Sequence, residues 1–252
     1  MIELYLVGIG MGNPDHLTAQ AVNALQHADL ILIPDKGSQK SDLADVRVTI
    51  CEKLLSPLPK MAKFSLPVRD EQEASYLKRV KSWHEEIALV WRDTILEHCP
   101  KGGRIALMIW GDPSLYDSSL RIAERLIAQD QKLTVNVIPG LTSVQLLTAA
   151  HKIPLNTLAE PVMIMTGRNL REKGWPESVK TAVVLLDGDC TFDQLEGQKY
   201  TIWWGAFLGM PQELLVSGSL AQCCEKIKAL RAAARAEHGW IMDTYLLQKN
   251  QT

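Results

Sequence analysis

Short apolar segments that end at glycine or proline alternate with longer segments of helical periodicity in the first half of the chain. Residues 2–7 form a β-rich segment that runs into a glycine loop, and Thr18 is suited to cap the helix that follows. Residues 30–33 are a second apolar segment, closed by Pro34 and Asp35. This order of strand, glycine loop, helix and strand predicts the start of a parallel α/β sheet.

The alternation continues as far as residue 150. Residues 71–98 place apolar side chains at helical spacing, which predicts one long amphipathic helix. Residues 36–70 show little periodicity, and we predict no element there. The other elements expected in this half are a strand at 104–110, a helix at 118–129, a strand at 134–138 and a helix that ends near residue 150.

The second half contains more strands for each helix, which indicates a mixed sheet. Its expected elements are strands at 162–165, 182–186, 200–204, 214–216 and 240–247 and a helix at 223–236. We therefore expect an α/β protein of two domains, with residues 1–115 in the first and residues 116–252 in the second.

Charge and cysteine content exclude several classes of protein. The 252 residues include 27 Lys and Arg against 29 Asp and Glu, a net charge of −2, which argues against a general nucleic-acid-binding protein. No secretion signal is visible at the start, and no apolar run approaches the ~20 residues that cross a membrane. The five cysteines include no C-x-x-C pair, so we expect no disulfide framework, no bound metal and a cytoplasmic location.

The first candidate loop contains Gly8, Gly10 and Gly12, directly after the first strand. Glycine lets a backbone approach a ligand closely, because no Cβ intervenes. The spacing departs from the G-x-G-x-x-G pattern of dinucleotide-binding loops, since Asn13 and Pro14 follow. A ligand-binding loop and a purely structural tight turn are both consistent with this segment.

The second candidate loop, residues 110–117, follows an apolar strand and contains Gly111, Asp112 and Tyr116. Ligands of parallel sheets bind beyond the carboxyl ends of the strands. Main-chain carbonyls and the Asp112 carboxylate would suit a cationic ligand there. Alternatively, Asp112 is the cap of the next helix, which is a common role for aspartate.

The third candidate loop joins a strand to a helix and contains Pro139, Gly140, Thr142 and Ser143. Free N–H groups at the start of a helix, together with two hydroxyl groups, suit a polar ligand. A capped helix start without any ligand would have the same sequence.

Together the three loops resemble the tetrapyrrole methylase family. Their order is Gly-x-Gly, then Gly-Asp-Pro-x-x-Tyr, then Pro-Gly-x-Thr-Ser, followed by Ala-Ala-His-Lys-Ile-Pro-Leu at residues 149–155. The resemblance covers nearly the whole chain. It implies two α/β domains with the active-site cleft between them, in an S-adenosylmethionine-dependent methyltransferase of the kind found in cobalamin and sirohaem synthesis.

Four stretches are closest to one subgroup of this family: residues 10–18, 33–37, 110–117 and 203–211. For this subgroup the resemblance implies methylation of precorrin-5 at ring carbon 1, followed by loss of the acetyl group at carbon 20 as acetate. Asn13, Asp117 and Lys152 depart from the residues usual in the wider family, and we interpret them as features of the subgroup.

The resemblance also assigns roles to residues of both predicted domains, with the tetrapyrrole bound on the first and the second completing the cofactor site. The implied contacts to S-adenosylmethionine, or to the product S-adenosylhomocysteine, are Gly111, Asp112, Leu115, Thr142, Ser143, Thr166, Leu208 and Gly209. The implied substrate contacts are Gly10, Pro14 and Arg168. Acetyl loss requires attack by water and stabilisation of an oxyanion, for which the candidates are Asp112, Tyr116, Asp35 and Lys36. The family further implies a homodimer.

This chemistry requires neither a metal nor a nucleophilic side chain. The donor methyl is already electrophilic, so the enzyme must mainly orient it toward a carbon nucleophile, which can lower the barrier by ~7–11 kcal/mol. Three alternatives stay open: a nicotinamide-dependent oxidoreductase that uses the Gly8 loop, a methyltransferase of the same fold with another acceptor, and a non-catalytic tetrapyrrole-binding protein.

Overall fold

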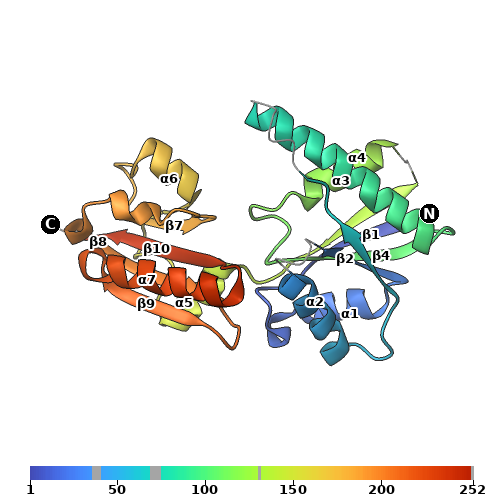
Figure 1. The fold of residues 1–252 in the computed structure, drawn as a ribbon, viewed down its shortest axis with the longest axis horizontal. Helices are drawn as coiled ribbons and strands as arrows, with labels where there is room; N and C mark the ends of the chain where they lie inside the picture. The colour runs from blue at the N-terminus through green and yellow to red at the C-terminus, as the bar shows by residue number, and fades with distance from the viewer. Residues whose placement is uncertain (36–40, 69–74, 130–131, 251–252) are drawn as a thin grey trace. The chain divides into compact units, whose positions relative to one another are not determined.

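The chain folds into two compact units. The computed structural model describes residues 1–35, 41–68, 75–129 and 132–250, and residue contacts divide the chain into Met1–Thr142 and Ser143–Thr252 (Figure 1). We predicted this division between residues 115 and 116. It lies later because the segment after residue 116 returns to the first sheet, where β5 (Leu133–Ile138) pairs with β1 (Ile2–Gly8).

The first unit is built on a five-stranded sheet in the order β3-β2-β4-β1-β5. The strands not yet given are β2 (Leu30–Asp35), β3 (Met61–Ser65) and β4 (Gly103–Ile109), and all neighbours are parallel. Parallel strands need crossover connections, which place helices on both faces and bury the strands on both sides. The parallel α/β prediction is therefore confirmed for this unit.

Two hydrophobic cores lie on opposite faces of this sheet (Figure 1). One contains side chains of α3 (Tyr76–His98) and α4 (Ser119–Gln129), among them the buried Trp91. The other contains side chains of α1 (Ala19–Gln26) and α2 (Ser41–Leu54). The long predicted helix is confirmed over α3, and residues 71–74 of that prediction lie outside the described residues.

Helix α2 and strand β3 were missed because their sequence patterns are interrupted. The buried stripe of α2 includes Ala44, Ile50 and Cys51, but it also includes Arg47, whose exposed fraction is only 8%. A charged residue at an inward position weakens the apolar periodicity that predicts a helix. Strand β3 is a short edge strand in which only alternate residues are buried.

The second unit contains a mixed sheet, as predicted, and its strands have the order β6-β7-β10-β8-β9. β6 and β7 are parallel, and the other neighbours are antiparallel. The strands are β6 (Val162–Thr166), β7 (Thr181–Leu185), β8 (Tyr200–Ala206), β9 (Leu214–Ser219) and β10 (Asp243–Lys249). The helices are α5 (Ser143–His151), α6 (Gly167–Lys173) and α7 (Leu220–His238), of which the short α6 was not predicted. The described residues also include the 3-10 helices η1 (Pro14–His16), η3 (Thr191–Gln194) and η4 (Gly197–Lys199).

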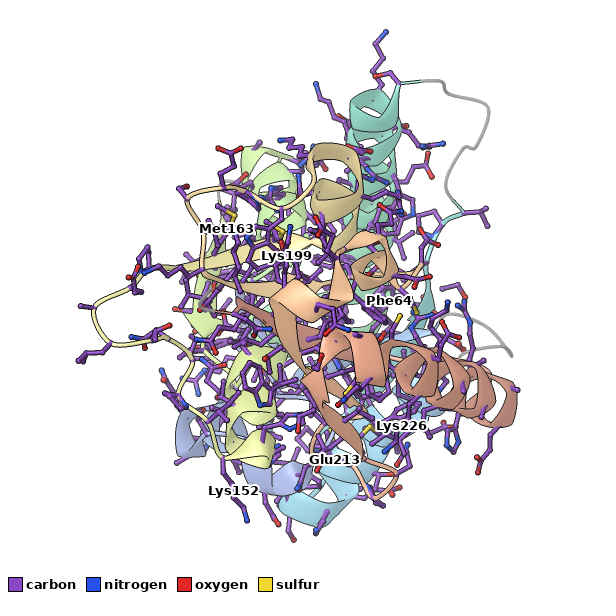
Figure 2. All side chains as sticks on the ribbon, turned by 90° about the vertical axis from the view of Figure 1, so that its left-hand side faces the viewer. Phe64, Lys152, Met163, Lys199, Glu213 and Lys226 are labelled. Carbon is purple, nitrogen blue, oxygen red and sulfur yellow. The ribbon has the colours of Figure 1, made fainter. Side chains whose placement is uncertain are left out.

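Charged and apolar side chains separate as expected for each unit. In the second unit Lys152, Lys199 and Lys226 are exposed, whereas in the first unit Phe64 is buried (Figure 2). Over the described ranges, no helix combines the length and the apolar character that a membrane span requires.

Candidate functional site

The three candidate loops of the first unit meet at one edge of its sheet. β4, β1 and β5 are adjacent and parallel, so their carboxyl ends and the loops that follow lie side by side. The main chains of the first two loops form a small antiparallel bridge. In it the Gly10 N–H donates to the Gly111 oxygen at 3.3 Å, and the Gly111 N–H donates to the Gly10 oxygen at 2.8 Å.

Two glycines allow the loops to pack this closely. A Cβ on Gly8 would lie 2.6 Å from the Gly140 nitrogen and 2.8 Å from the Gly111 oxygen, and a Cβ on Gly140 would overlap the same oxygen. Gly10 and Gly111 also have positive φ angles, +69° and +71°, which favour glycine. The glycines that we considered for close approach to a ligand therefore have a structural role between the loops.

Asp112 connects the second loop to the third. Its Oδ2 accepts a hydrogen bond from the Gly140 N–H at 2.8 Å, and its Oδ1 accepts one from the Ser114 N–H at 2.8 Å. Burial raises the pKa of the Asp112 carboxyl, but the hydrogen bonds from Ser114 and Gly140 outweigh burial and leave the pKa below its usual value. The alternative reading as a helix cap is wrong, because α4 begins only at Ser119.

Leu115 and Tyr116 follow Asp112 in the same loop. The Leu115 N–H donates to the Asp112 main-chain oxygen at 3.2 Å. Tyr116 has a φ of +51°, which is uncommon for a residue with a large side chain, and 47% of its surface is exposed. Strained residues that surrounding contacts maintain are enriched at functional sites, which supports Tyr116 as a candidate.

Gly10 and Pro14 lie at the two ends of the first loop. Pro14 begins the 3-10 helix η1, which Asn13 caps by accepting the Asp15 N–H at 2.9 Å. A Cβ on Gly10 would lie 3.2 Å from the Cβ of His16. This proline and this glycine therefore shape one tight turn beside the second loop.

Asp35 lies at the end of the strand next to the three-loop cluster. It ends β2, which pairs with β4 on the side away from β1, and its register partner is Ser65 of β3. Lys36 lies outside the described residues. Because β2 and β4 are adjacent and parallel, Asp35 lies at the same edge of the sheet as the second loop, which contains Asp112 and Tyr116.

In the second unit, Thr166 and Arg168 lie at the start of α6. Thr166 caps this helix: its Oγ1 accepts the Asn169 N–H at 3.2 Å and donates to Asn169 Oδ1 at 2.7 Å. Arg168 is exposed on the first turn of the helix.

Thr142 and Ser143 lie on either side of the division between the units. Thr142 is the last residue of the first unit, and Ser143 begins α5. The Ser143 hydroxyl is hydrogen-bonded to the Thr244 hydroxyl at 3.1 Å, which connects α5 to β10.

Leu208 and Gly209 form a turn after β8. Leu208 is buried, and it lies so close to Gly205 that a Cβ there would approach it to 2.6 Å. Phe207 and Gly209 have φ angles of +51° and +78°, and the Gly209 N–H donates to Glu213 Oε2 at 2.7 Å. The turn is thus defined by backbone conformation more than by polar side chains.

A buried carboxylate at the end of β7 was missed by the sequence analysis. Asp187 accepts hydrogen bonds from the Tyr245 hydroxyl at 2.7 Å and from the Thr191 hydroxyl at 2.8 Å. A Cβ on Gly167 would lie 2.6 Å from the Asp187 side chain, so this carboxylate packs under the start of α6. The preceding Leu186 has a φ of +54° and is 68% exposed. The position of Asp187 directly after an apolar segment was the one sequence feature that could have marked it as a candidate.

Arg231 of α7 bonds to the main chain of Asp187 and forms a buried ion pair with Asp243. Arg231 Nη2 donates to the Asp187 main-chain oxygen at 2.9 Å, and Arg231 Nε pairs with Asp243 Oδ2 at 3.0 Å. Trp204 Nε1 donates to the same Asp243 oxygen at 2.9 Å. Burial raises the pKa of the Asp243 carboxyl, although Arg231 and Trp204 favour its ionised form. The two side chains of the ion pair are only 11% and 7% exposed.

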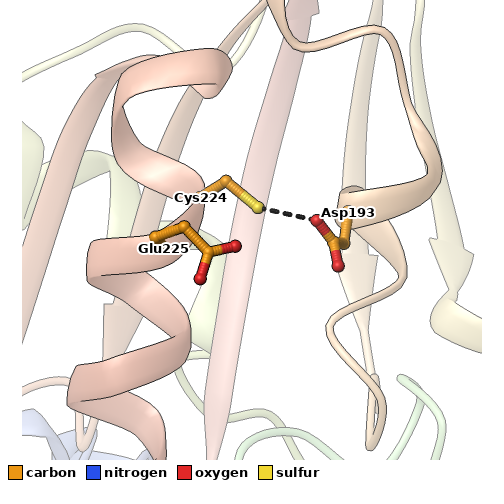
Figure 3. Close-up of side chains that lie close together, drawn as sticks. All are labelled: Asp193, Cys224 and Glu225. Carbon is orange, nitrogen blue, oxygen red and sulfur yellow. Dashed lines mark hydrogen bonds between the residues drawn. The ribbon is translucent and has the colours of Figure 1, made fainter.

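One group of possible metal ligands is found among the described residues (Figure 3). Cys224 Sγ donates to Asp193 Oδ1 at 3.1 Å, and Glu225 lies beside them. The Lys228 ammonium group already bonds to both carboxylates at 2.9 Å. Burial, together with the hydrogen bond to Asp193, raises the pKa of the Cys224 thiol to about 12. This is the chemistry of a surface ion-pair cluster with a protonated thiol.

Comparisons with known proteins agree on one family. The sequence profile described as Tetrapyrrole (Corrin/Porphyrin) Methylases matches residues 3–224. A precorrin-6A synthase (deacetylating) from Sinorhizobium sp. is 44% identical over 251 residues, which cover 99% of this chain and 96% of that relative.

Solved structures extend the agreement to three dimensions. A cobalamin synthesis related protein (CobF) from Corynebacterium diphtheriae is 39% identical, covers 100% of both chains and has a TM-score of 0.84. A uroporphyrin-III C-methyltransferase from Thermus thermophilus, complexed with S-adenosylhomocysteine, is 18% identical, covers 98% of this chain and 92% of that chain, and has a TM-score of 0.58. The second likeness concerns the fold alone, and the predicted fold class is confirmed.

Proposed function

Because this chain belongs to the tetrapyrrole (corrin/porphyrin) methylase family, we propose that it methylates ring carbon 1 of precorrin-5 and releases the carbon-20 acetyl group as acetate, giving precorrin-6A. The main support for this proposal is the 44% identity to a precorrin-6A synthase over 99% of this chain. The chain is an S-adenosylmethionine-dependent methyltransferase of cobalamin biosynthesis. A nicotinamide-dependent oxidoreductase is set aside, because the family is one of methylases.

The residues of the first unit fit a cationic methyl donor. Asp112 is ionised and lies at the carboxyl edge of a parallel sheet, beside the closely packed backbones of Gly8, Gly111 and Gly140. Bound S-adenosylmethionine supplies an electrophilic methyl group on a sulfonium centre. Within the first unit we propose contacts from Gly111, Asp112, Leu115 and Thr142.

Residues of the second unit complete the proposed set of cofactor contacts. They are Ser143, Thr166, Leu208 and Gly209. The hydroxyls of Ser143 and Thr166 are oriented by their bonds to Thr244 and Asn169. Rigid contacts of this kind orient a bound donor, and orientation is the main requirement of methyl transfer from a sulfonium.

For the substrate we propose contacts from Gly10, Pro14 and Arg168, with Tyr116, Asp35 and Lys36 as candidates that assist acetyl loss beside Asp112. The phenol of Tyr116 is exposed and can donate a hydrogen bond to a developing oxyanion. Asp112 is ionised, so it can attract a cation or accept a proton but does not serve as a proton donor near neutral pH.

We also propose that the enzyme is a homodimer in the cytoplasm. Sedimentation equilibrium measures the mass directly, and a mass close to the 28.1 kDa of one chain would contradict the dimer.

The function is tested with purified protein, precorrin-5 and S-adenosylmethionine that carries an isotope-labelled methyl group. Mass spectrometry of the pigment should find one added labelled methyl and the loss of an acetyl fragment, with acetate released. Label without acetate release would limit the activity to methylation. No label in the pigment would contradict the proposed reaction. It would favour a non-catalytic tetrapyrrole-binding protein or a methyltransferase with another acceptor.

A further inference from the structure

Arg47 is a buried cation beside the second loop. It lies on α2 with an exposed fraction of 8%, and within the described ranges no other Lys or Arg is buried to this degree. Its Nε donates to the Met108 oxygen of β4 at 3.1 Å, and its Nη1 donates to the Leu43 oxygen at 2.8 Å. Its guanidinium carbon lies 5.5 Å from the ring centre of Trp110, the residue directly before Gly111.

These contacts orient Arg47 but do not neutralise it. Both acceptors are neutral carbonyl oxygens, and no described carboxylate lies within ion-pair distance of the guanidinium. Asp117 acts on Arg47 through its charge at longer range, while its Oδ1 accepts the Ser119 N–H at 2.6 Å. Nη2 donates to none of the described residues. A buried cation without a close counter-ion is strongly unfavourable, so an anion that reaches it would bind well.

Further unsatisfied polar atoms lie on the neighbouring elements. Trp110 Nε1 and His16 Nδ1 are buried and have no hydrogen-bond partner among the described residues. His16 ends η1, the short helix after the first loop, and α2 packs against η1. Buried polar atoms are hydrogen-bonded in most proteins, so unsatisfied atoms on Trp110, against which Arg47 lies, and on η1, against which α2 packs, require an explanation, and a ligand site supplies one.

We propose that Arg47, with Trp110 on one side of its guanidinium, forms a subsite for a carboxylate side chain of the tetrapyrrole substrate. A guanidinium with free N–H groups binds a carboxylate through paired, charge-assisted hydrogen bonds. The substrate carboxylate would supply the missing counter-ion and would anchor the ring system beside the Gly111–Asp112 turn. The identity of the ligand rests on the proposed function, whereas the anion-binding chemistry rests on Arg47 itself.

The kinetic test compares Arg47→Met with Arg47→Lys and with Arg92→Met, an exposed control on α3. For Arg47→Met we expect the KM for precorrin-5 to rise about tenfold or more, with kcat changed less than about threefold. The affinity for S-adenosylhomocysteine should stay the same, and Arg47→Lys should recover part of the KM because it keeps the charge. An unchanged KM, or equal losses of kcat and cofactor affinity, would show a scaffold residue and overturn the subsite.

A second measurement works on the folded wild-type protein and needs no substrate turnover. The Nε–H resonance of Arg47 is identified by its absence from Arg47→Lys. Glutarate, which matches a propionate side chain in chemistry, should shift this resonance saturably, and the neutral glutaramide should not. Equal shifts, or no shift with glutarate, would overturn the subsite even if Arg47→Met does not fold. A glutarate response without methylation of precorrin-5 would instead reject only the proposed function.

Discussion

The two units carry their candidate residues in different ways. In the first unit the loops are joined mainly through the main chain, with Gly8, Gly111 and Gly140 in close contact and the Asp112 carboxylate bonded to Gly140. In the second unit the start of α6, with Thr166 and Arg168, packs on the buried Asp187, which Tyr245 and Arg231 hold in place. We therefore expect the first unit to be destabilised by substitutions that add side-chain atoms to its glycines. The second unit should be destabilised by substitutions that remove a buried charge.

The sheets explain this difference. A parallel sheet gathers consecutive loops at one edge, where adjacent backbones can meet. A mixed sheet distributes its turns over both ends, so a segment at one strand end needs support from other elements. In the second unit this support comes from β10 and α7, which bring Tyr245 and Arg231 to the end of β7.

The largest effect is expected for Arg231→Met in the second unit. The change leaves Asp243 buried without its cation and should lower the free energy of unfolding by about 3–5 kcal/mol. Urea denaturation measures this loss. Lys228→Met, on the exposed side of the same helix, is the matched control and should change stability little. Equal losses of stability in the two variants would show that the buried ion pair contributes no more to the second unit than an exposed one.

The next effect is expected for Gly140→Ala in the first unit. The new Cβ would overlap the Gly111 oxygen, and separating the loops should cost about 1–3 kcal/mol of stability as well as most of the methylation activity. Gly188→Ala is the control, because no atom lies within 4 Å of a Cβ there. Thermal denaturation of both variants, with activity assays, checks this. A fully active Gly140→Ala enzyme would mean that the loop contact is dispensable.

A smaller effect is expected when the Asp112 charge is removed. Asp112→Ala should weaken S-adenosylhomocysteine binding about tenfold, because both a negative charge and the tie to Gly140 are lost. Isothermal titration calorimetry gives the affinity, and circular dichroism verifies the fold. Unchanged affinity would exclude Asp112 from the cofactor site and leave it a purely structural role.

The smallest effect is the pH dependence of the Asp112 contribution. Its pKa in the folded chain is lower than in the unfolded chain, so its stabilisation is complete above the unfolded pKa of about 3.9 and is lost as pH falls through the folded value. The difference in melting temperature between wild type and Asp112→Asn should therefore shrink below about pH 4. A difference that grows on acidification would contradict the direction of this pKa shift.

Sequence reasoning identified most elements and the three loops but misjudged particular residues. It considered Asp112 as a cofactor ligand or a helix cap; the cap is wrong, and the sequence did not reveal that the carboxylate accepts a hydrogen bond from Gly140, 28 positions away. It missed α2 because Arg47 interrupts the apolar stripe of this helix. The proposed carboxylate subsite uses this same arginine. It missed Asp187 because an aspartate after a strand does not reveal that a tyrosine 58 positions later will bond to it.

Local patterns alone determined most of the strand and helix order, the mixed second sheet, the family resemblance and the types of residue in each loop. These properties depend on neighbours a few positions apart, whose periodicity and turn chemistry are written in the chain. Tertiary structure alone decided that Gly8, Gly111 and Gly140 touch, that the first unit extends to Thr142, and that Arg47 is buried. Such contacts join residues that are far apart in the chain, so no local pattern can record them.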